Sequence, residues 1–192
     1  MRGPCWTLNC ATEGIGRTYP QHQTMGPGYA YDAPNSVHKL PFDSLPDFDP
    51  NFDTIIIHGH AKLTDLLSTA PIRHTGYLVS SRLRGLFEEF KLPLHRFYPV
   101  PATHRGKPVN DYFWLQLPGL RLPLTDDSTI EELEAAINTE SKFASLDLLR
   151  IHEPTQFAYC FVSDPLRRAM DSAKITGVRF GTAKLFRSVG NT

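Results

Sequence analysis

The order of apolar and polar positions along the chain predicts two strand–helix pairs. Residues 77–80 have the apolar pattern of a strand, and a helix is predicted over about 81–91. The apolar positions of that helix recur at spacings of three and four, so they share one face. They are Leu83, Leu86, Phe87 and Phe90. Residues 157–162 form a second apolar strand pattern, and Ser163-Asp164-Pro165 predicts the start of a helix that ends near residue 173.

Shorter patterns predict further strands and a loop-rich beginning. The strands are expected at 52–57, 94–100, 112–117 and, after Gly177, 178–180. Residues 1–54 contain aromatic side chains separated by turn residues, which favours short strands and ordered loops. We therefore expect 1–54 to be an aromatic segment packed on an α+β domain at 55–187, the two forming one structural domain.

Two more helices are predicted from weaker signals. A short one covers 62–69 and ends before Pro71. The other covers 129–138, because a serine and a threonine at 128–129, followed by two glutamates, form a capping-box pattern.

An internal repeat is the most informative feature of the sequence. Residues 78–97 and 161–180 align without a gap at an offset of 83, and seven of the twenty positions are identical. The shared serine, Ser80 or Ser163, closes a strand, and its hydroxyl can accept a backbone N–H of the helix that follows. The repeat predicts two strand–helix–strand units that pack about a pseudo-twofold axis or form similar halves of one sheet. Such units also resemble one another by chance, which is the alternative interpretation.

The predicted fold class is therefore α+β. We expect a single mixed, mainly antiparallel sheet with three or four helices, built around two similar units at 77–97 and 160–180.

Composition and charge reduce the classes of protein to which this chain could belong. The chain has 192 residues, 41% of them hydrophobic, with 20 basic and 20 acidic side chains and zero formal net charge. It lacks the basic patch of a nucleic-acid-binding protein. The three cysteines, Cys5, Cys10 and Cys160, have no metal-ligand spacing and suit a reducing cytosol. No signal segment is apparent, and the run Ile55–Ile57 is too short to span a membrane, so a cytoplasmic protein is expected.

Three stretches resemble the immunity-eleven family, a domain of unknown function of the myxobacterial immunity-protein type found beside bacterial polymorphic toxin genes. They are the segment from Lys62 to Leu67, the segment from Tyr77 to Phe90, and Phe161 to Phe180. The resemblance implies an immunity protein that neutralises a cognate secreted toxin by tight binding in the producing cell. It implies no reaction, so we expect neither an enzyme nor catalytic residues, cofactors or bound metal.

Candidate chemistry in the sequence leaves two alternatives. His58-Gly59-His60 follows a predicted strand and could seat a metal, with a third ligand from Asp65, His74, His95 or His104. That pair would suit a metal-assisted or hydrolytic antidote enzyme, but two ordinary surface histidines are the simpler interpretation. The other alternative is a homo-oligomeric accessory protein, since zero net charge opposes self-association little. A homodimer is also compatible with the immunity role.

The predicted partner-binding surface combines aspartates with aromatic rings in the N-terminal segment. Carboxylates can face a basic substrate-binding surface of a toxin, while rings supply buried contact area. The alternative is that the rings cover the core and the aspartates start turns. The assigned residues are Phe42, Asp43, Asp47, Phe48, Asp49 and Asp53, with Phe52 interleaved among them.

Overall fold

The computed structural model describes residues 5–10, 23–68, 76–120, 145–152 and 158–182, with the single positions 132 and 135. The strands are β1 (Cys5–Cys10), β2 (Gln23–Met25), β3 (Ile55–Ile57), β4 (Leu66–Ser68), β5 (Gly76–Ser80), β6 (Arg96–Pro99), β7 (Ala102–His104), β8 (Lys107–Val109), β9 (Tyr112–Gln116), β10 (Leu148–His152), β11 (Ala158–Ser163) and β12 (Val178–Thr182). The helices are the 3-10 helix η1 (Val37–Lys39), α1 (Ser81–Glu88) and α4 (Asp164–Ser172).

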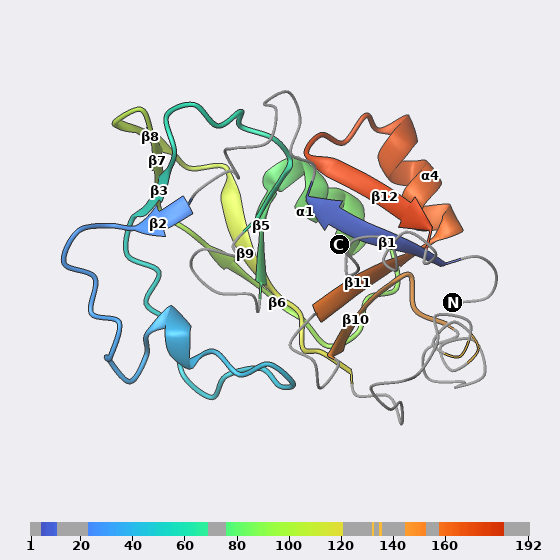
Figure 1. Ribbon diagram of the computed structural model, residues 1–192, viewed down its shortest axis with the longest axis horizontal. Coiled ribbons are helices and arrows are strands. Elements are labelled where there is room, and N and C mark those ends of the chain that lie inside the picture. Colours follow the sequence, from blue (N-terminus) through green and yellow to red (C-terminus); the bar gives the residue numbers. More distant parts are fainter. Residues whose placement is uncertain are drawn as a thin grey trace, which may run out of the picture.

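The strands form three four-stranded sheets (Figure 1). The strand orders are β4-β5-β9-β6, β10-β11-β1-β12 and β2-β3-β7-β8. Neighbouring strands are antiparallel except β3 and β7, which are parallel. The α+β class and the mainly antiparallel pairing are confirmed.

The single predicted sheet is wrong. Strands β5 and β6 both pair with β9, whereas β11 and β12 both pair with β1, so each strand–helix–strand segment builds a sheet of its own. Alternation of apolar and polar residues identifies the faces of a strand but not its neighbours.

The predicted helices are confirmed only in part. Helices α1 and α4 begin where predicted, and they are the two α-helices that the structure describes over their full length, against the three or four expected. The helix expected over 62–69 is wrong, because this stretch contains strand β4. Leu66 and Leu67 point into different cores, so both faces of β4 are buried and its sequence shows no alternation. Of the helix expected over 129–138, the structure describes positions 132 and 135, and both are helical.

Two of the sheets, each with its helix, have the same plan. We call β4, β5, α1, β6 and β9 unit 1, and β10, β11, α4, β12 and β1 unit 2. In each unit the third strand of the sheet lies between the strands that flank the helix, and the helix packs on one face. The registers correspond as well, because Phe97 lies opposite Leu115 in unit 1 and Phe180 lies opposite Leu8 in unit 2. The predicted repeat is therefore a structural one.

The chain completes the two units differently. In unit 1 the third strand, β9, follows the other elements along the chain. In unit 2 the corresponding strand is β1, which is separated from β11 by more than 140 residues (Figure 1). Residues 1–54 thus contribute to two places, since β1 belongs to unit 2 while 23–54 lie on unit 1.

The units share an inner core formed by the helix-bearing faces of their sheets. Equivalent residues meet at its centre, including Leu66 with Leu148 and Leu115 with Leu8. A second, outer core lies on the opposite face of the unit 1 sheet, where Leu78, Tyr98 and Trp114 pack against residues 25–61 and strand β7. None of the helices in the described ranges is long and apolar enough to cross a bilayer.

Candidate functional site

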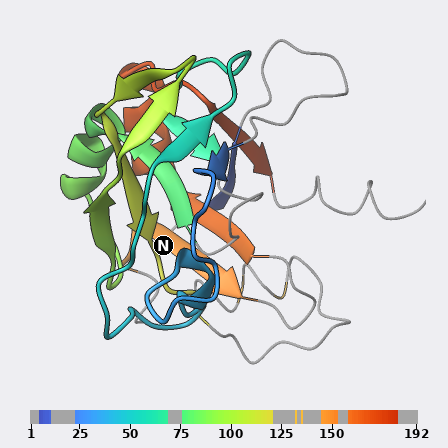
Figure 2. The ribbon, with the colours of Figure 1, turned by 90° about the vertical axis from the view of Figure 1, so that its left-hand side faces the viewer.

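The predicted partner-binding residues lie in one long loop, residues 26–54, which we call the acidic loop. It joins β2 to β3, and its ends meet because Gly26 N–H donates to the Thr54 carbonyl at 2.8 Å. In Figure 2 it faces the viewer, with η1 in its lower part. The loop has almost no regular secondary structure, so its shape depends on specific side-chain contacts.

Polar contacts inside the acidic loop hold it in one conformation. The Tyr29 hydroxyl donates to the Asn51 carbonyl at 2.6 Å and accepts the Val37 N–H at 2.8 Å. Asn51 N–H also donates to the Asn35 carbonyl at 2.8 Å. These bonds join the two arms of the loop around buried Val37 and Leu40.

The acidic loop is also anchored to unit 1. The fully buried Gln116 side chain donates to the Pro41 carbonyl at 2.9 Å, and Gly119 N–H donates to the Phe42 carbonyl at 2.7 Å. The Phe52 ring packs on Trp114, with ring centroids 5.3 Å apart. The acidic loop is therefore held against unit 1 both at Pro41 and Phe42 and at Phe52.

The structure separates the predicted rings from the predicted carboxylates. Phe52 is buried in the outer core and Phe48 is half-buried against it, so both serve packing, as the alternative interpretation held. Phe42 remains 40% exposed. The aspartates are all exposed, namely Asp43, Asp47, Asp49 and Asp53. Asp53 also accepts the Thr54 N–H at 2.7 Å. Their role in binding a partner stays a prediction.

The acidic loop is strongly charged for its length. It contains five aspartates and one lysine, a formal net charge of −4 in a chain whose charges balance to zero. The aspartate outside the predicted set is Asp32, which is also exposed. Arg96 of β6 lies within electrostatic range of Asp49. The loop therefore places a concentration of negative charge on one side of unit 1.

Among the residues that the structure describes, the His58/His60 pair gathers no third ligand for a metal ion. The two rings lie 5.4 Å apart between centroids, and the His60 N–H donates to His58 Nδ1 at 3.3 Å. Asp65 is engaged in a separate network, and His74 lies outside the described residues. In the ranges that the structure describes, no three His, Cys, Asp or Glu side chains gather closely enough to hold a metal ion.

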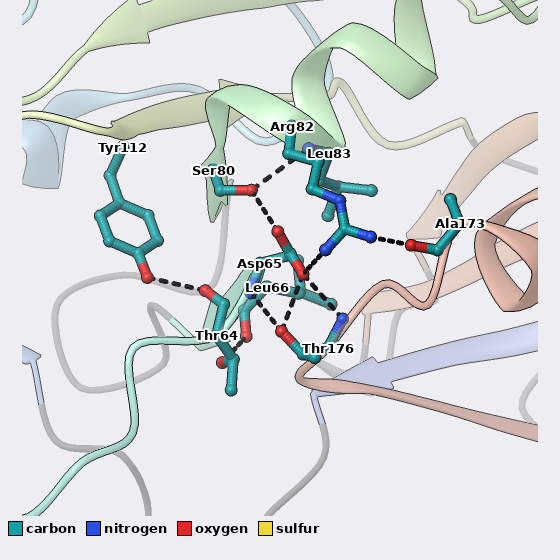
Figure 3. A network of polar contacts seen from close by, with 9 residues as sticks. All are labelled: Thr64, Asp65, Leu66, Ser80, Arg82, Leu83, Tyr112, Ala173 and Thr176. Carbon is teal, nitrogen blue, oxygen red and sulfur yellow. Dashed lines mark hydrogen bonds and ion pairs between the residues drawn. The ribbon is translucent and has the colours of Figure 1, made fainter.

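A buried carboxylate joins the two units (Figure 3). Asp65 accepts hydrogen bonds from the Ser80 hydroxyl at 2.7 Å and from the Thr176 hydroxyl and N–H at 2.7 and 2.8 Å. Ser80 in turn accepts the Leu83 N–H and caps α1. Arg82 lies 3.5 Å from the carboxylate and donates to the Ala173 carbonyl. One side chain therefore connects the start of α1 to the loop that follows α4.

Unit 2 has the matching arrangement. Asp147 accepts the Ser163 hydroxyl at 2.6 Å, and Ser163 caps α4 through the Leu166 N–H. The other Asp147 oxygen accepts the Lys91 N–H, in the loop after α1, at 3.0 Å. Each aspartate thus holds the helix of its own unit and the loop of the other. We call these two networks the aspartate clasps.

The surroundings of Asp65 keep its carboxyl group ionised, which suits a structural role and not proton transfer near neutral pH. Burial acts to raise the pKa of Asp65, but hydrogen bonds from Thr176 and Ser80 and the charge of Arg82 outweigh it and lower the pKa. Burial together with the nearby Asp65 and Asp111 raises the pKa of Tyr112, whose hydroxyl donates to the Thr64 carbonyl at 2.7 Å. Both groups keep a fixed protonation state near neutral pH.

No family model matches the sequence. A search of curated proteins likewise finds no relative of this chain. The resemblance to the immunity-eleven family therefore rests on the residues of the three stretches given above, and the immunity role stays a prediction.

Proposed function

We propose that this chain is an immunity protein that neutralises a protein toxin in the cytoplasm of the producing cell by forming a stoichiometric complex. The proposed contact surface is the acidic loop, with Asp47 and Asp49 as its charged centre and Phe42 as an apolar anchor. The observation that carries the proposal is the combination of local charge and fixed shape: a net charge of −4 on a loop with internal and external anchors.

Fixed shape matters because binding costs conformational entropy. A side chain or loop that is ordered before binding loses less freedom when the partner arrives. Exposed carboxylates gathered on one side accelerate encounter with a basic partner and disfavour acidic ones. These properties support a protein partner with a basic surface, such as a toxin whose substrate-binding face carries lysines and arginines.

The test is coexpression with the product of the adjacent toxin gene. Toxicity is scored with and without this chain, and complex formation is measured by co-purification and calorimetry. We expect the Asp47→Lys/Asp49→Lys double variant to weaken binding by about 100-fold, since like charges that face each other cost several kcal/mol. Protection should fail with it. Phe42→Ala should weaken binding by about 10-fold, as expected for an apolar anchor.

A matched control separates this effect from charge reversal in general. Glu89, at the C-terminal end of α1, is also exposed, so Glu89→Lys should leave binding and protection unchanged. All three variants should keep the free energy of unfolding within about 0.5 kcal/mol, because they alter exposed side chains. Full protection by the Asp47→Lys/Asp49→Lys variant would contradict the acidic loop as the contact surface. Protection without any stable complex would contradict neutralisation by binding.

A further inference from the structure

Strand β1 fills a position in unit 2 that the rest of unit 2 cannot fill. It lies between β11 and β12, as β9 lies between β5 and β6. Its registered partners run from Cys5 opposite Ser163 on one side to Cys10 opposite Val178 on the other. Without β1, the facing backbone groups of β11 and β12 would lose their hydrogen-bond partners, which is costly for buried strands.

The contacts of β1 are specific and lie within unit 2 and the inner core. Leu8 is 3% exposed in the inner core, and the Thr7 hydroxyl donates to the Gly181 carbonyl at 3.0 Å. The Trp6 indole N–H donates to Asp164 at 3.2 Å, and the Arg167 guanidinium lies 4.5 Å from the centre of the Trp6 ring. A β1 strand from another copy of the chain would find the same contacts.

We propose that β1 is an exchangeable strand, and that two copies of this chain form a dimer in which each β1 completes unit 2 of the other. Twelve residues, 11–22, join β1 to β2, and they include Gly14 and Gly16. Swapping of this kind adds no new interface chemistry, so it is a low-cost route to a dimer. In unit 1, by contrast, strands β7 and β8 lie between β6 and β9 along the chain and pair with each other in the third sheet.

Concentration decides which form dominates. Because β1 is part of the same chain, its effective concentration at its own unit 2 is on the order of 1 mM. Exchange therefore competes when the protein itself approaches that concentration, or when concentrated unfolded chains refold together. Zero net charge offers little repulsion against such an encounter.

The test uses a disulfide to record which copy supplied β1. Cys10 lies directly opposite Val178, so the full-length Cys5→Ser/Val178→Cys variant can form a disulfide between Cys10 of β1 and the new thiol at position 178 of β12. Cys160 is fully buried, and burial raises its pKa to about 12, so it stays an unreactive thiol. The variant is refolded at about 10 µM and about 1 mM, concentrations below and near the effective concentration of β1 at its own unit 2. It is then oxidised and run on a non-reducing gel, and adding Cys10→Ser provides the uncrosslinked control.

Exchange predicts a covalent dimer at the higher concentration that is cleaved by reductant and absent from the control. At the lower concentration the bond should close within one chain. A disulfide-linked monomer as the sole product at both concentrations would overturn the proposal. A dimeric mass with only intrachain disulfides would also overturn it, because such a dimer would use another surface. For a variant that does not oxidise, the unmodified chain is refolded at the higher concentration, and a monomeric mass by light scattering overturns the proposal.

Discussion

Units 1 and 2 have similar inner faces but different outer faces. On the inner side the repeat places identical residues at equivalent positions, such as Val79 with Val162 and Leu83 with Leu166. On the outer side, Trp114 of β9 corresponds to Thr7 of β1 by register. The difference follows the surroundings, because the inner faces meet each other across a shared core whereas the outer face of unit 1 carries the acidic loop.

The loops that follow the two helices also differ at equivalent positions. Gly177 of unit 2 is buried against Thr64 and Leu66 and has a φ of +77°. Its counterpart in unit 1 at the offset of 83 is Leu94, which is 71% exposed. The correspondence between the two units is therefore close at the aspartate clasps and lost a few residues beyond them. Comparing substitutions at equivalent positions shows where the symmetry has energetic consequences.

The largest expected effect is at this loop pair. In Gly177→Ala the new Cβ would collide with the Leu66 carbonyl oxygen, and alanine disfavours the positive φ. We expect a loss of about 3–5 kcal/mol in the free energy of unfolding, measured by urea denaturation. Leu94→Ala should change it by about 0.5 kcal/mol or less, since the side chain is exposed. Equal effects at both positions would contradict the asymmetry.

The aspartate clasps should differ by a smaller amount. Asp65→Ala removes three hydrogen bonds and the ion pair with Arg82 from a buried site. Asp147→Ala removes two hydrogen bonds from a half-buried site. Losses of about 3 and about 1.5 kcal/mol are expected, by the same denaturation assay. A larger loss for Asp147→Ala than for Asp65→Ala would show that burial does not decide which aspartate clasp stabilises the fold more.

Acid should weaken the Asp65 clasp. Its pKa is lowered in the folded chain, so its stabilising effect is complete above the unfolded-state pKa of about 3.9 and is lost as the pH falls through the folded-state pKa. The free energy of unfolding should therefore decrease below about pH 4. In Asp65→Asn this decrease should be shallower, as measured by urea denaturation from about pH 6 to about pH 2.5. An unchanged slope would show that Asp65 is not the group responsible.

Local sequence signals predicted α1, α4 and their caps but not the completion of unit 2. Ser80 and Ser163 cap their helices as the repeat indicated. The aspartates of the clasps had a signal that was missed, since Asp-Leu-Leu occurs at both 65–67 and 147–149. The offset there is 82, because Leu66 pairs with Val79 while Leu148 pairs with Val162, so unit 2 has one more residue in its hairpin. The pairing of β1 gave no local signal, because its partner strands lie at the far end of the chain.

The candidate surface on the acidic loop could also be predicted only in part from the sequence. Phe42-Asp43 and Phe52-Asp53 are the same dipeptide in similar surroundings of proline and aspartate. One phenylalanine is 40% exposed and the other is 6% exposed. Composition predicted that rings and carboxylates would alternate here. Which ring reaches solvent depends on Tyr98 and Trp114, which lie 46 and 62 residues after Phe52 and which no local pattern connects to the loop.

The smallest expected difference concerns an arginine that the repeat keeps in both units. Arg84 lies 4.5 Å from the centre of the Phe113 ring, and Arg167 lies 4.5 Å from the centre of the Trp6 ring, at the register equivalent of Phe113. Tryptophan is the better partner for a cation, and the Arg167 side chain is 23% exposed against 37% for Arg84. Arg167→Met should therefore cost about 1 kcal/mol and Arg84→Met about 0.5 kcal/mol.

A double-variant cycle with Trp6→Leu isolates the ring contribution from the ion pairs that Arg167 makes with Asp164 and Asp171. The coupling between Arg167 and Trp6 should exceed that between Arg84 and Phe113 in the matching cycle with Phe113→Leu. If the two couplings are equal, the kind of ring does not matter at this position. The arginine would then be kept in both units for its contacts along the helix, where Arg84 bonds Glu88 at 2.8 Å and Arg167 bonds Asp171 at 2.8 Å.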